Sequence, residues 1–274
     1  QTKAIYSDGA GSGGKMVDAF ATLSVVDLLV DDDLTVTGSV AVTGDYSSAT
    51  SGTSNLRLGV NAGNSIASGG NYNVVVGDEA GTAITTGDNN TAIGYAAGTA
   101  ITTGYESVFI GSLSGDALNE GFMNIAIGHG ALSADTKGSK SVAIGKQALA
   151  VQNFTTATNA LNTAVGHNAG IAVTSGIKNT LIGGEVGDAL TDADYNTALG
   201  FGSLGFDQLG SKTTAIGYRA LGTQRFTSAT DSYNTAVGYD AGLEVTTGVQ
   251  NTLIGGLAGD AITVGVRNVA LSAN

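Results

Sequence analysis

The stretch Asn90-Thr91-Ala92-Ile93-Gly94 is one copy of a five-residue unit that recurs through most of the chain. The unit returns at a nearly constant interval, which is clearly longer only before Gly166 and before Gly238, and a final unit at 268–272 carries Ser in place of Gly. Self-similarity at a short fixed period is typical of a solenoid, in which each repeat stacks on its neighbours. We call the last residue of each unit the rung glycine: Gly59, Gly77, Gly94, Gly111, Gly128, Gly145, Gly166, Gly183, Gly200, Gly217, Gly238 and Gly255.

Two columns of branched side chains define the expected strand. The residue one before each rung glycine is aliphatic, as in Ile93 and Ile144, and the residue three before it is Thr, Val, Ile or Leu. Residues two apart on a strand face the same way, so we expect these columns to form its buried face. The residue between them is mostly Ala, as in Ala92 and Ala143. We expect this alanine column to face outward, against a neighbouring chain; the alternative is an alanine face that is simply exposed to solvent.

Four residues before the rung glycine, ten units carry Asn and the other three carry Ser or Thr. Asn side chains bond to nearby backbone at turns and stack into ladders in repetitive β structures. We therefore interpret this column as structural rather than as a binding site, and expect the rung glycine itself at a φ that other residues resist. The central members of the ladder are Asn90, Asn124, Asn162, Asn179, Asn196, Asn234 and Asn251.

A second column of small residues, including Ala62, Ala97 and Ala148, lies three residues after the rung glycine. It suggests that each coil holds two short strands and two turns. The sequence thus predicts an all-β fold, a parallel β-solenoid with 17-residue coils. At about 4.8 Å per coil, thirteen rungs would make a rod about 60 Å long. The rungs from Gly128 to Gly183 match those from Gly200 to Gly255 in order and spacing, which indicates that a block of four coils was duplicated.

The first part of the chain has a different pattern. Residues 1–22 are rich in Gly, and from Leu23 the chain alternates, with a six-residue repeat in which 34–38 read LTVTG and 40–44 read VAVTG. We expect a short β-rich stalk or attachment segment over residues 1–54. The solenoid of thirteen rungs is expected over residues 55–274.

Composition excludes several classes of protein. The chain has 274 residues, of which 42% are hydrophobic and only 12% charged, so it is not typical of a disordered protein. Its formal net charge of −12 argues against nucleic acid and anionic membranes as partners. No apolar run is long enough to span a membrane, so we expect no membrane insertion. Without Cys there is no disulfide or thiolate metal site.

The unit Ser141-Val142-Ala143-Ile144-Gly145, with Ala148 and Ala150 beyond it, resembles the repeat in the head domains of trimeric autotransporter adhesins. The resemblance covers about residues 55–274 and implies a left-handed β-roll in which three chains associate side by side. The coil of this chain is longer than is usual in that family. The segment from Leu34 is similar to segments of bacteriophage tail fibres. Both resemblances imply a homotrimer on a virion or extracellular surface, with a cell-surface glycan or receptor and an adjoining fibre or virion protein as partners.

The two longer intervals each insert four residues, which carry the receptor-contact candidates. Insertions in solenoids project as loops on one face, where binding residues tend to lie. An exposed aromatic ring beside amides and hydroxyls would suit stacking on a sugar. An equally weighted alternative is that the two Phe side chains tuck back and cap a neighbouring coil. The candidates are Gln152, Phe154, Gln224, Arg225 and Phe226.

No catalytic or cofactor site is predicted. The only two histidines, His129 and His167, follow rung glycines two coils apart and are expected to face solvent, so they cannot share a metal within one chain. No Ser-His-Asp arrangement or phosphate-binding Gly loop stands out. The carboxylates Asp116, Asp188 and Asp260 recur because of the duplication. The run at 31–33 (DDD) suggests a solvated turn, with a cation site as the alternative. We therefore expect neither an enzyme nor a bound cofactor or metal.

The leading functional hypothesis is a structural and adhesive fibre, the shaft of a phage tail fibre or adhesin that attaches to a cell surface. A subunit of an extracellular filament or surface layer is the main alternative. A third hypothesis, an ice-binding solenoid, rests on the Thr pairs at 85–86, 102–103 and 246–247. A polysaccharide-degrading enzyme is a more distant fourth.

Overall fold

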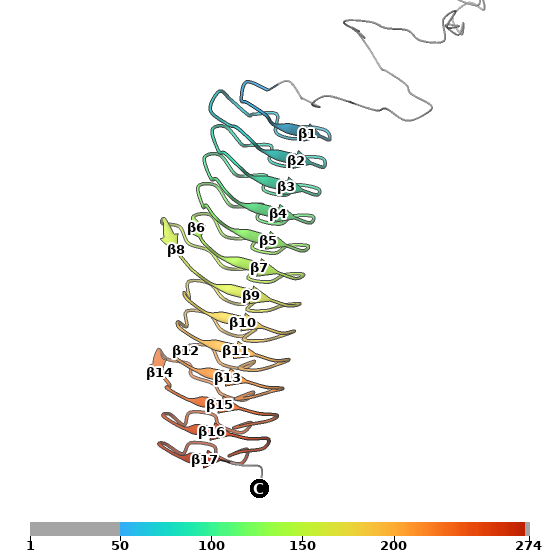
Figure 1. The fold of residues 1–274 in the computed structure, drawn as a ribbon. Coiled ribbons are helices and arrows are strands. Elements are labelled where there is room, and N and C mark those ends of the chain that lie inside the picture. The colour runs from blue at the N-terminus through green and yellow to red at the C-terminus, as the bar shows by residue number, and fades with distance from the viewer. Residues whose placement is uncertain (1–49, 272–274) are drawn as a thin grey trace, which may run out of the picture. The chain divides into compact units, whose positions relative to one another are not determined.

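The computed structural model describes residues 50–271. These lie in one of two compact units, Tyr46–Asn274, and wind into a regular stack of β-coils (Figure 1). The residues for which a β-rich stalk was expected lie, up to residue 49, outside the described part of the chain. Between residues 50 and 271 every regular element is a strand, and the all-β solenoid expected from the repeat is confirmed.

One long sheet runs through every coil. Each of its thirteen strands is three residues long, ends one residue before the rung position, and pairs in parallel with the equivalent strand of the next coil. Thr180, for example, pairs with Thr163 on one side and with Thr197 on the other. The 17-residue period is thus one circuit of the solenoid. The strands are β1 (Leu56–Leu58), β2 (Val74–Val76), β3 (Thr91–Ile93), β4 (Val108–Ile110), β5 (Ile125–Ile127), β7 (Val142–Ile144), β9 (Thr163–Val165), β10 (Thr180–Ile182), β11 (Thr197–Leu199), β13 (Thr214–Ile216), β15 (Thr235–Val237), β16 (Thr252–Ile254) and β17 (Val269–Leu271).

Two small sheets mark the inserted residues. Strand β6 (Gly138–Ser139) pairs in parallel with β8 (Thr158–Asn159), and β12 (Gly210–Ser211) pairs in the same way with β14 (Thr230–Asp231). Apart from these, the rest of each coil is made of turns and bends. The expected second strand in every coil is therefore wrong. The reason is local: the residues two and four after the rung glycine have positive φ, as at Asn168 (56°) and Gly170 (56°), which breaks an extended strand.

The rung glycines allow the coils to stack closely. Their φ values all lie between 125° and 143°, a region that disfavours side chains, as expected from the sequence. A Cβ atom added to Gly183 would lie 2.6 Å from the carbonyl oxygen of Gly200 in the next coil. Glycine is therefore required here both by conformation and by the close approach of successive backbones.

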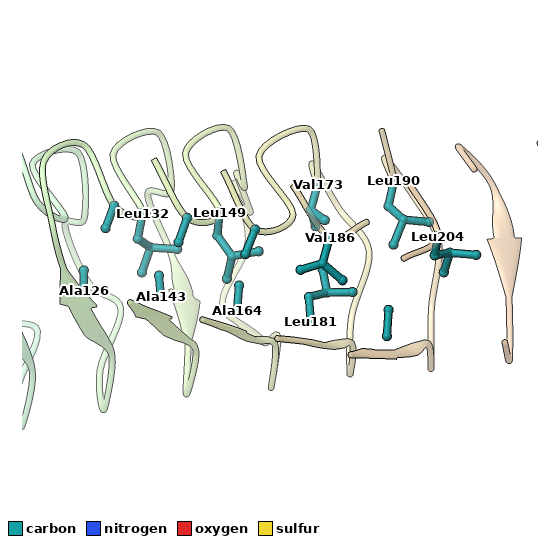
Figure 2. Close-up of a cluster of buried hydrophobic side chains, with 14 of the residues drawn as sticks. Ala126, Leu132, Ala143, Leu149, Ala164, Val173, Leu181, Val186, Leu190 and Leu204 are labelled. Atoms are coloured by element: carbon teal, nitrogen blue, oxygen red, sulfur yellow. The ribbon is translucent and has the colours of Figure 1, made fainter. Parts of the chain in front are cut away.

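The core contradicts the expected facing of the strand. The central residue of each long-sheet strand from β2 to β16 is buried, and Ala143, Ala164 and Ala198 are completely buried. The residues on either side of it are half-buried or exposed. Figure 2 shows the inward alanines opposite leucine and valine side chains from the turns. The coil is thin, and these larger side chains leave room only for a small residue on the strand.

The strand and the turns form the two walls of the core, and a large side chain on one wall faces a small residue on the other. Phe109 replaces the usual inward alanine in β4 and is completely buried. A Cβ atom at Gly98 or Gly115 on the opposite wall would lie 2.9 Å or 2.3 Å from its ring. In contrast, Leu132 and Leu149 occupy that opposite position where the strand carries Ala. Where both walls of one coil are small, side chains of the neighbouring coils fill the space, as Leu181 and Leu149 do beside Gly170, so the core stays closely packed.

Candidate functional site

The Asn column forms a buried ladder, as expected. Asn179 donates a side-chain hydrogen bond of 2.7 Å to the carbonyl of Ala193, and its Oδ1 accepts a bond of 3.0 Å from the backbone N–H of Asn196. Most of the column repeats this pattern, so each side chain ties its own coil and the next one together. Most hydrogen bonds of the ladder join a side chain to the backbone, so few donors or acceptors of the Asn side chains remain for a ligand. Its members Asn90, Asn124, Asn162, Asn179, Asn196, Asn234 and Asn251 are all at most 1% exposed.

The outer face of the long sheet carries a regular array of exposed side chains. Every strand contributes two outward side chains, and none of them is buried. Ile110 and Ile182 are each 37% exposed, and Leu199 is 46% exposed. The second outward column is Val, Ile or Leu in most of the first coils and Thr in six consecutive later coils. This sheet face, formed by the first and third residues of the strands, carries one continuous aliphatic column on the surface rather than forming the core it was expected to be.

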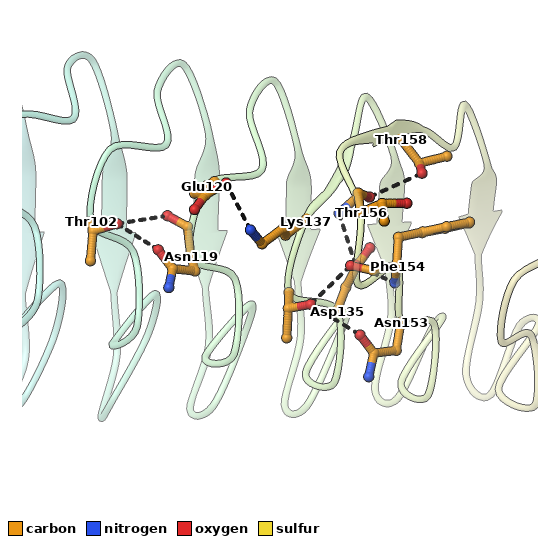
Figure 3. Close-up of polar contacts among 11 residues, drawn as sticks. Thr102, Asn119, Glu120, Asp135, Lys137, Asn153, Phe154, Thr156 and Thr158 are labelled. Carbon is orange, nitrogen blue, oxygen red and sulfur yellow. Dashed lines mark hydrogen bonds and ion pairs between the residues drawn. The ribbon is translucent and has the colours of Figure 1, made fainter.

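The insertions are held by a buried carboxylate. Asp135 accepts hydrogen bonds from the backbone N–H groups of Gly138 (2.9 Å) and Phe154 (3.0 Å), the latter within the insertion (Figure 3). It also accepts a bond of 2.6 Å from the side chain of Gln152. Gln152 in turn accepts a bond of 2.8 Å from Asn162, and so continues the Asn ladder.

The duplicated block repeats this network. Asp207 accepts bonds from Gly210 (3.2 Å), Phe226 (2.9 Å) and Gln224 (2.6 Å). Burial raises the pKa of Asp207 above its usual value, and hydrogen bonds from Gln224 and from backbone N–H groups offset part of that effect. The same balance raises the pKa of Asp135. We interpret these groups as structural, because both side chains are buried and bonded to the wall of the solenoid.

The placement of the receptor-contact candidates differs from what was expected. Gln152 and Gln224 are completely buried, Phe154 is 8% exposed and Phe226 is 6% exposed. These four side chains lie within the solenoid and present almost no surface to a receptor. The alternative, in which the two Phe side chains tuck back, describes the structure. Arg225 is exposed, as are residues 155–157 and 227–229 in the loops.

The other residues weighed for chemistry lie apart. His129 and His167 are exposed, as expected. Within residues 50–271 there is no group of three or more His, Cys, Asp or Glu side chains that could hold a metal ion. Burial raises the pKa values of Asp116 and Asp188, and the negative charge of Glu185 adds to the effect on Asp188. Each of these carboxylates occupies the turn of its own coil.

A hollow on the turn side was not anticipated. It has a volume of about 180 Å³ and lies over Gly202 and Gly205, between the exposed rings of Phe201 and Phe206. The coil on one side contributes Glu185 and Asp188, and the coil on the other side contributes Arg219 and Gly222. Phe201 also begins a row of rings, 6.0 Å from Tyr218, which is 5.1 Å from Tyr239. The available sequence signal was the divergence of the two duplicated blocks at these positions.

Comparison with known proteins identifies no relative: no family model, curated protein or solved structure matches the chain. Over the part of the chain that is described, no helix is long and apolar enough to cross a membrane.

Proposed function

We propose that this chain is the shaft of a homotrimeric fibre, of the phage tail-fibre or adhesin type, which attaches to a cell surface. The observation that carries the proposal is the sheet face. It runs through all thirteen coils, and two columns of outward side chains along it leave aliphatic groups such as Ile110, Ile182 and Ile254 more than a third exposed. Large continuous apolar patches on a protein surface mark interaction sites.

A second and a third copy of the same chain are the occupants that fit this face best. A partner must present an equally long and regular apolar strip, and a second solenoid of the same period does so coil by coil. Closed symmetry is the rule for soluble oligomers. The number three comes from the resemblance of the repeat to trimeric adhesin heads, in which chains associate side by side. The alanine column, earlier assigned to this contact, points into the core instead.

Repetition suits the attachment role. Each coil contacts mainly its neighbours, so added coils increase reach without requiring a new core. Three parallel copies would also multiply weak contacts with a receptor. The adjoining fibre or virion protein and the location on a virion or extracellular surface belong to this same proposal.

Mass in solution tests the proposal. We expect sedimentation equilibrium to give three times the chain mass of 27.0 kDa. A variant with Ile110→Lys, Ile182→Lys and Ile254→Lys should become monomeric while keeping its β-sheet circular dichroism, because the introduced charges would have to be buried between copies. Tyr239→Lys is a matched control, since Tyr239 is 59% exposed outside the sheet face. A wild-type chain that stays monomeric at micromolar concentration would contradict the proposal.

A second candidate function has one specific observation in its favour. Six consecutive strands place Thr on the sheet face, at Thr163, Thr180, Thr197, Thr214, Thr235 and Thr252. Their spacing of about 4.8 Å forms a regular array of hydroxyl and methyl groups, which suits binding to ice. This array replaces the Thr pairs that first suggested the idea. An ice-binding chain would have to leave the face uncovered, so a monomer with thermal hysteresis would favour it over the fibre.

A further inference from the structure

The hollow beside Phe201 exists because two side chains are missing. Gly202 and Gly205 form its floor, and a Cβ atom added to Gly205 would lie 3.4 Å from Oδ1 of Asp188. Most other coils carry a side chain at one or both of the equivalent positions, for example Glu185 and Asp188 in the coil before. The depression is therefore a local feature of one coil rather than a groove that follows the period.

Aromatic rings border the hollow. Phe206 is 63% exposed and Phe201 is 50% exposed, which is unusual for phenyl rings with no role in the core. Tyr218 stacks on one side of Phe201. On the other side lies Gly184, where an added Cβ atom would approach the Phe201 ring to 3.3 Å. Because Gly184 has no side chain, that side of the ring is not covered by the preceding coil.

Charged side chains surround the rings without neutralising one another. Glu185 and Asp188 come from one adjacent coil and Arg219 from the other. Across residues 50–271, the only ion pairs join Lys137 to Glu120 and Lys212 to Asp231, so none of these three side chains is held in an ion pair. The Asp188 carboxylate accepts its own backbone N–H and keeps further acceptor capacity. Carboxylates accept, and a guanidinium donates in a fixed geometry.

We propose that this hollow binds one uncharged sugar residue of a cell-surface glycan, an inference that rests on the proposed attachment function and gives it a receptor site. The C–H faces of a sugar ring pack on aromatic rings, and its hydroxyls pair with carboxylates and guanidinium groups. A volume of about 180 Å³ is below that of pockets for drug-sized ligands, which suits a single ring. Two carboxylates against one guanidinium disfavour acidic or phosphorylated sugars.

The duplicated block provides an internal comparison. In the first copy of the block, Gly130 and Asp116 stand where the second copy has Gly202 and Asp188. The core is also preserved, with Leu132 for Leu204. The two copies share a scaffold, but only one of them carries the rings, the second floor glycine and the guanidinium, as expected for a site added to the scaffold. At the other positions of the hollow, Glu185, Phe201, Gly205, Phe206, Arg219 and Gly222 are replaced by Leu113, His129, Ser133, Ala134, Gln147 and Ala150.

The test uses the full chain on an array of uncharged oligosaccharides built from glucose, galactose, mannose or N-acetylglucosamine, with sialylated and phosphorylated glycans as counter-probes. Wild-type protein should bind at least one uncharged glycan. Gly205→Ser, Phe206→Ala and Arg219→Gln each introduce the residue of the first block, so the fold should tolerate them, and each should weaken binding at least tenfold. Tyr233→Ala and Arg267→Gln are controls of the same kind outside the hollow and should leave binding unchanged.

A transplant provides the converse test. Introducing Leu113→Glu, His129→Phe, Ser133→Gly, Ala134→Phe, Gln147→Arg and Ala150→Gly should raise the number of sugar sites per chain from one to two in calorimetry with the bound oligosaccharide. No uncharged ligand, binding of acidic glycans only, or variants that bind as wild type would each overturn the proposal. If one of these outcomes is found in a chain that is trimeric, the proposed sugar site is wrong and the proposed fibre function is unaffected. If the chain is monomeric, the proposed fibre function is wrong.

Discussion

Gln152 donates a hydrogen bond of 2.6 Å to Asp135, and Gln224 makes the same 2.6 Å bond to Asp207 in the duplicated block. All four side chains are completely buried. Each carboxylate lies in the coil before an insertion and replaces the aliphatic side chain that fills this place in other coils, such as Ile101 and Leu118. The insertion is part of the solenoid wall, because its backbone, at the Phe residue, is bonded to this carboxylate.

The buried carboxylates predict a dependence of stability on pH. Burial raises the pKa values of Asp135 and Asp207 above 3.8, so the folded state favours their protonated forms. Their stabilising contribution is therefore full below 3.8 and is lost as the pH rises through the raised values. We expect the urea midpoint of the Asp135→Asn/Asp207→Asn variant to fall less than that of the wild type between pH 3.5 and pH 7, values chosen to bracket about 3.8.

Asp231 provides the control for this experiment. Its hydrogen bond with Lys212 lowers its pKa, so any contribution has the opposite sign and is lost as the pH falls. Asp231 is also exposed, and the pair should add little. An Asp231→Asn variant should therefore follow the wild type. If the Asp135→Asn/Asp207→Asn variant followed it as well, the buried carboxylates would not be the source of the dependence.

The ladder predicts a cost for a single missing amide. Asn179→Ala removes the acceptor for the backbone N–H of Asn196 and the donor to the carbonyl of Ala193, both inside the solenoid. Leaving buried polar groups unpaired should destabilise the chain by about 1–3 kcal/mol. Asn179→Asp keeps the acceptor alone. Urea unfolding should rank wild type above both variants, and equal midpoints for wild type and Asn179→Ala would show that the ladder is not stabilising.

Two glycines near the end of the stack allow a comparison between a position that requires glycine and a position that does not. Gly238 has a φ of 143°, and an added Cβ atom would lie 2.3 Å from the carbonyl oxygen of Gly255. Gly238→Ala should therefore cost at least about 1–3 kcal/mol. At Gly256 the nearest atom to an added Cβ is 4.0 Å away, so Gly256→Ala should be nearly neutral. Thermal melts measure both, and a neutral Gly238→Ala would contradict the role given to the rung glycines.

The period and the pairing of the coils could be predicted from the sequence. Thirteen rungs fix the register because Asn and Gly recur at the same two places, and the structure pairs the strands in that register. The facing was wrong for a physical reason. Two apolar residues on either side of a small one are typical of a strand whose two apolar residues are buried. In a coil this thin, however, side chains from the opposite wall fill the interior and leave space only for the small residue. Ala164 therefore faces inward, whereas Val165 does not.

The candidate site was less accessible to sequence reasoning. The sequence left open whether Phe154 and Phe226 are exposed or tucked back, because it does not show that Asp135 and Asp207 hold the inserted backbone against the solenoid. A buried carboxylate bonded to backbone cannot be recognised from residue types alone. The hollow at Phe206 was missed because its side chains come from three successive coils and no column of the repeat marks them. A comparison of the two duplicated blocks would have singled it out.

The corrected facing makes a direct prediction for β11. Ala198 is completely buried and Thr197 is exposed. Ala198→Ile should overpack the core and destabilise the chain by about 1–3 kcal/mol, whereas Thr197→Ile should change monomer stability by less than about 0.5 kcal/mol. Urea unfolding of the two variants, each in the monomeric Ile110→Lys/Ile182→Lys/Ile254→Lys background, gives the comparison. A larger effect of Thr197→Ile would restore the original assignment of the inner face.

Cross-linking between neighbouring strands tests most directly whether one circuit of the chain places equivalent residues side by side. The chain has no cysteine, so Thr180→Cys with Thr197→Cys introduces the only two thiols. Their Cα atoms lie on paired strands about 4.8 Å apart, which a disulfide can bridge, whereas Thr180→Cys with Thr214→Cys spans two strands, about 9.6 Å, and cannot be bridged. Peptide mapping of the oxidised, denatured single chain should find an intrachain disulfide in the first pair and none in the second. A disulfide in the second pair with none in the first would contradict the stacked coil and everything inferred from it.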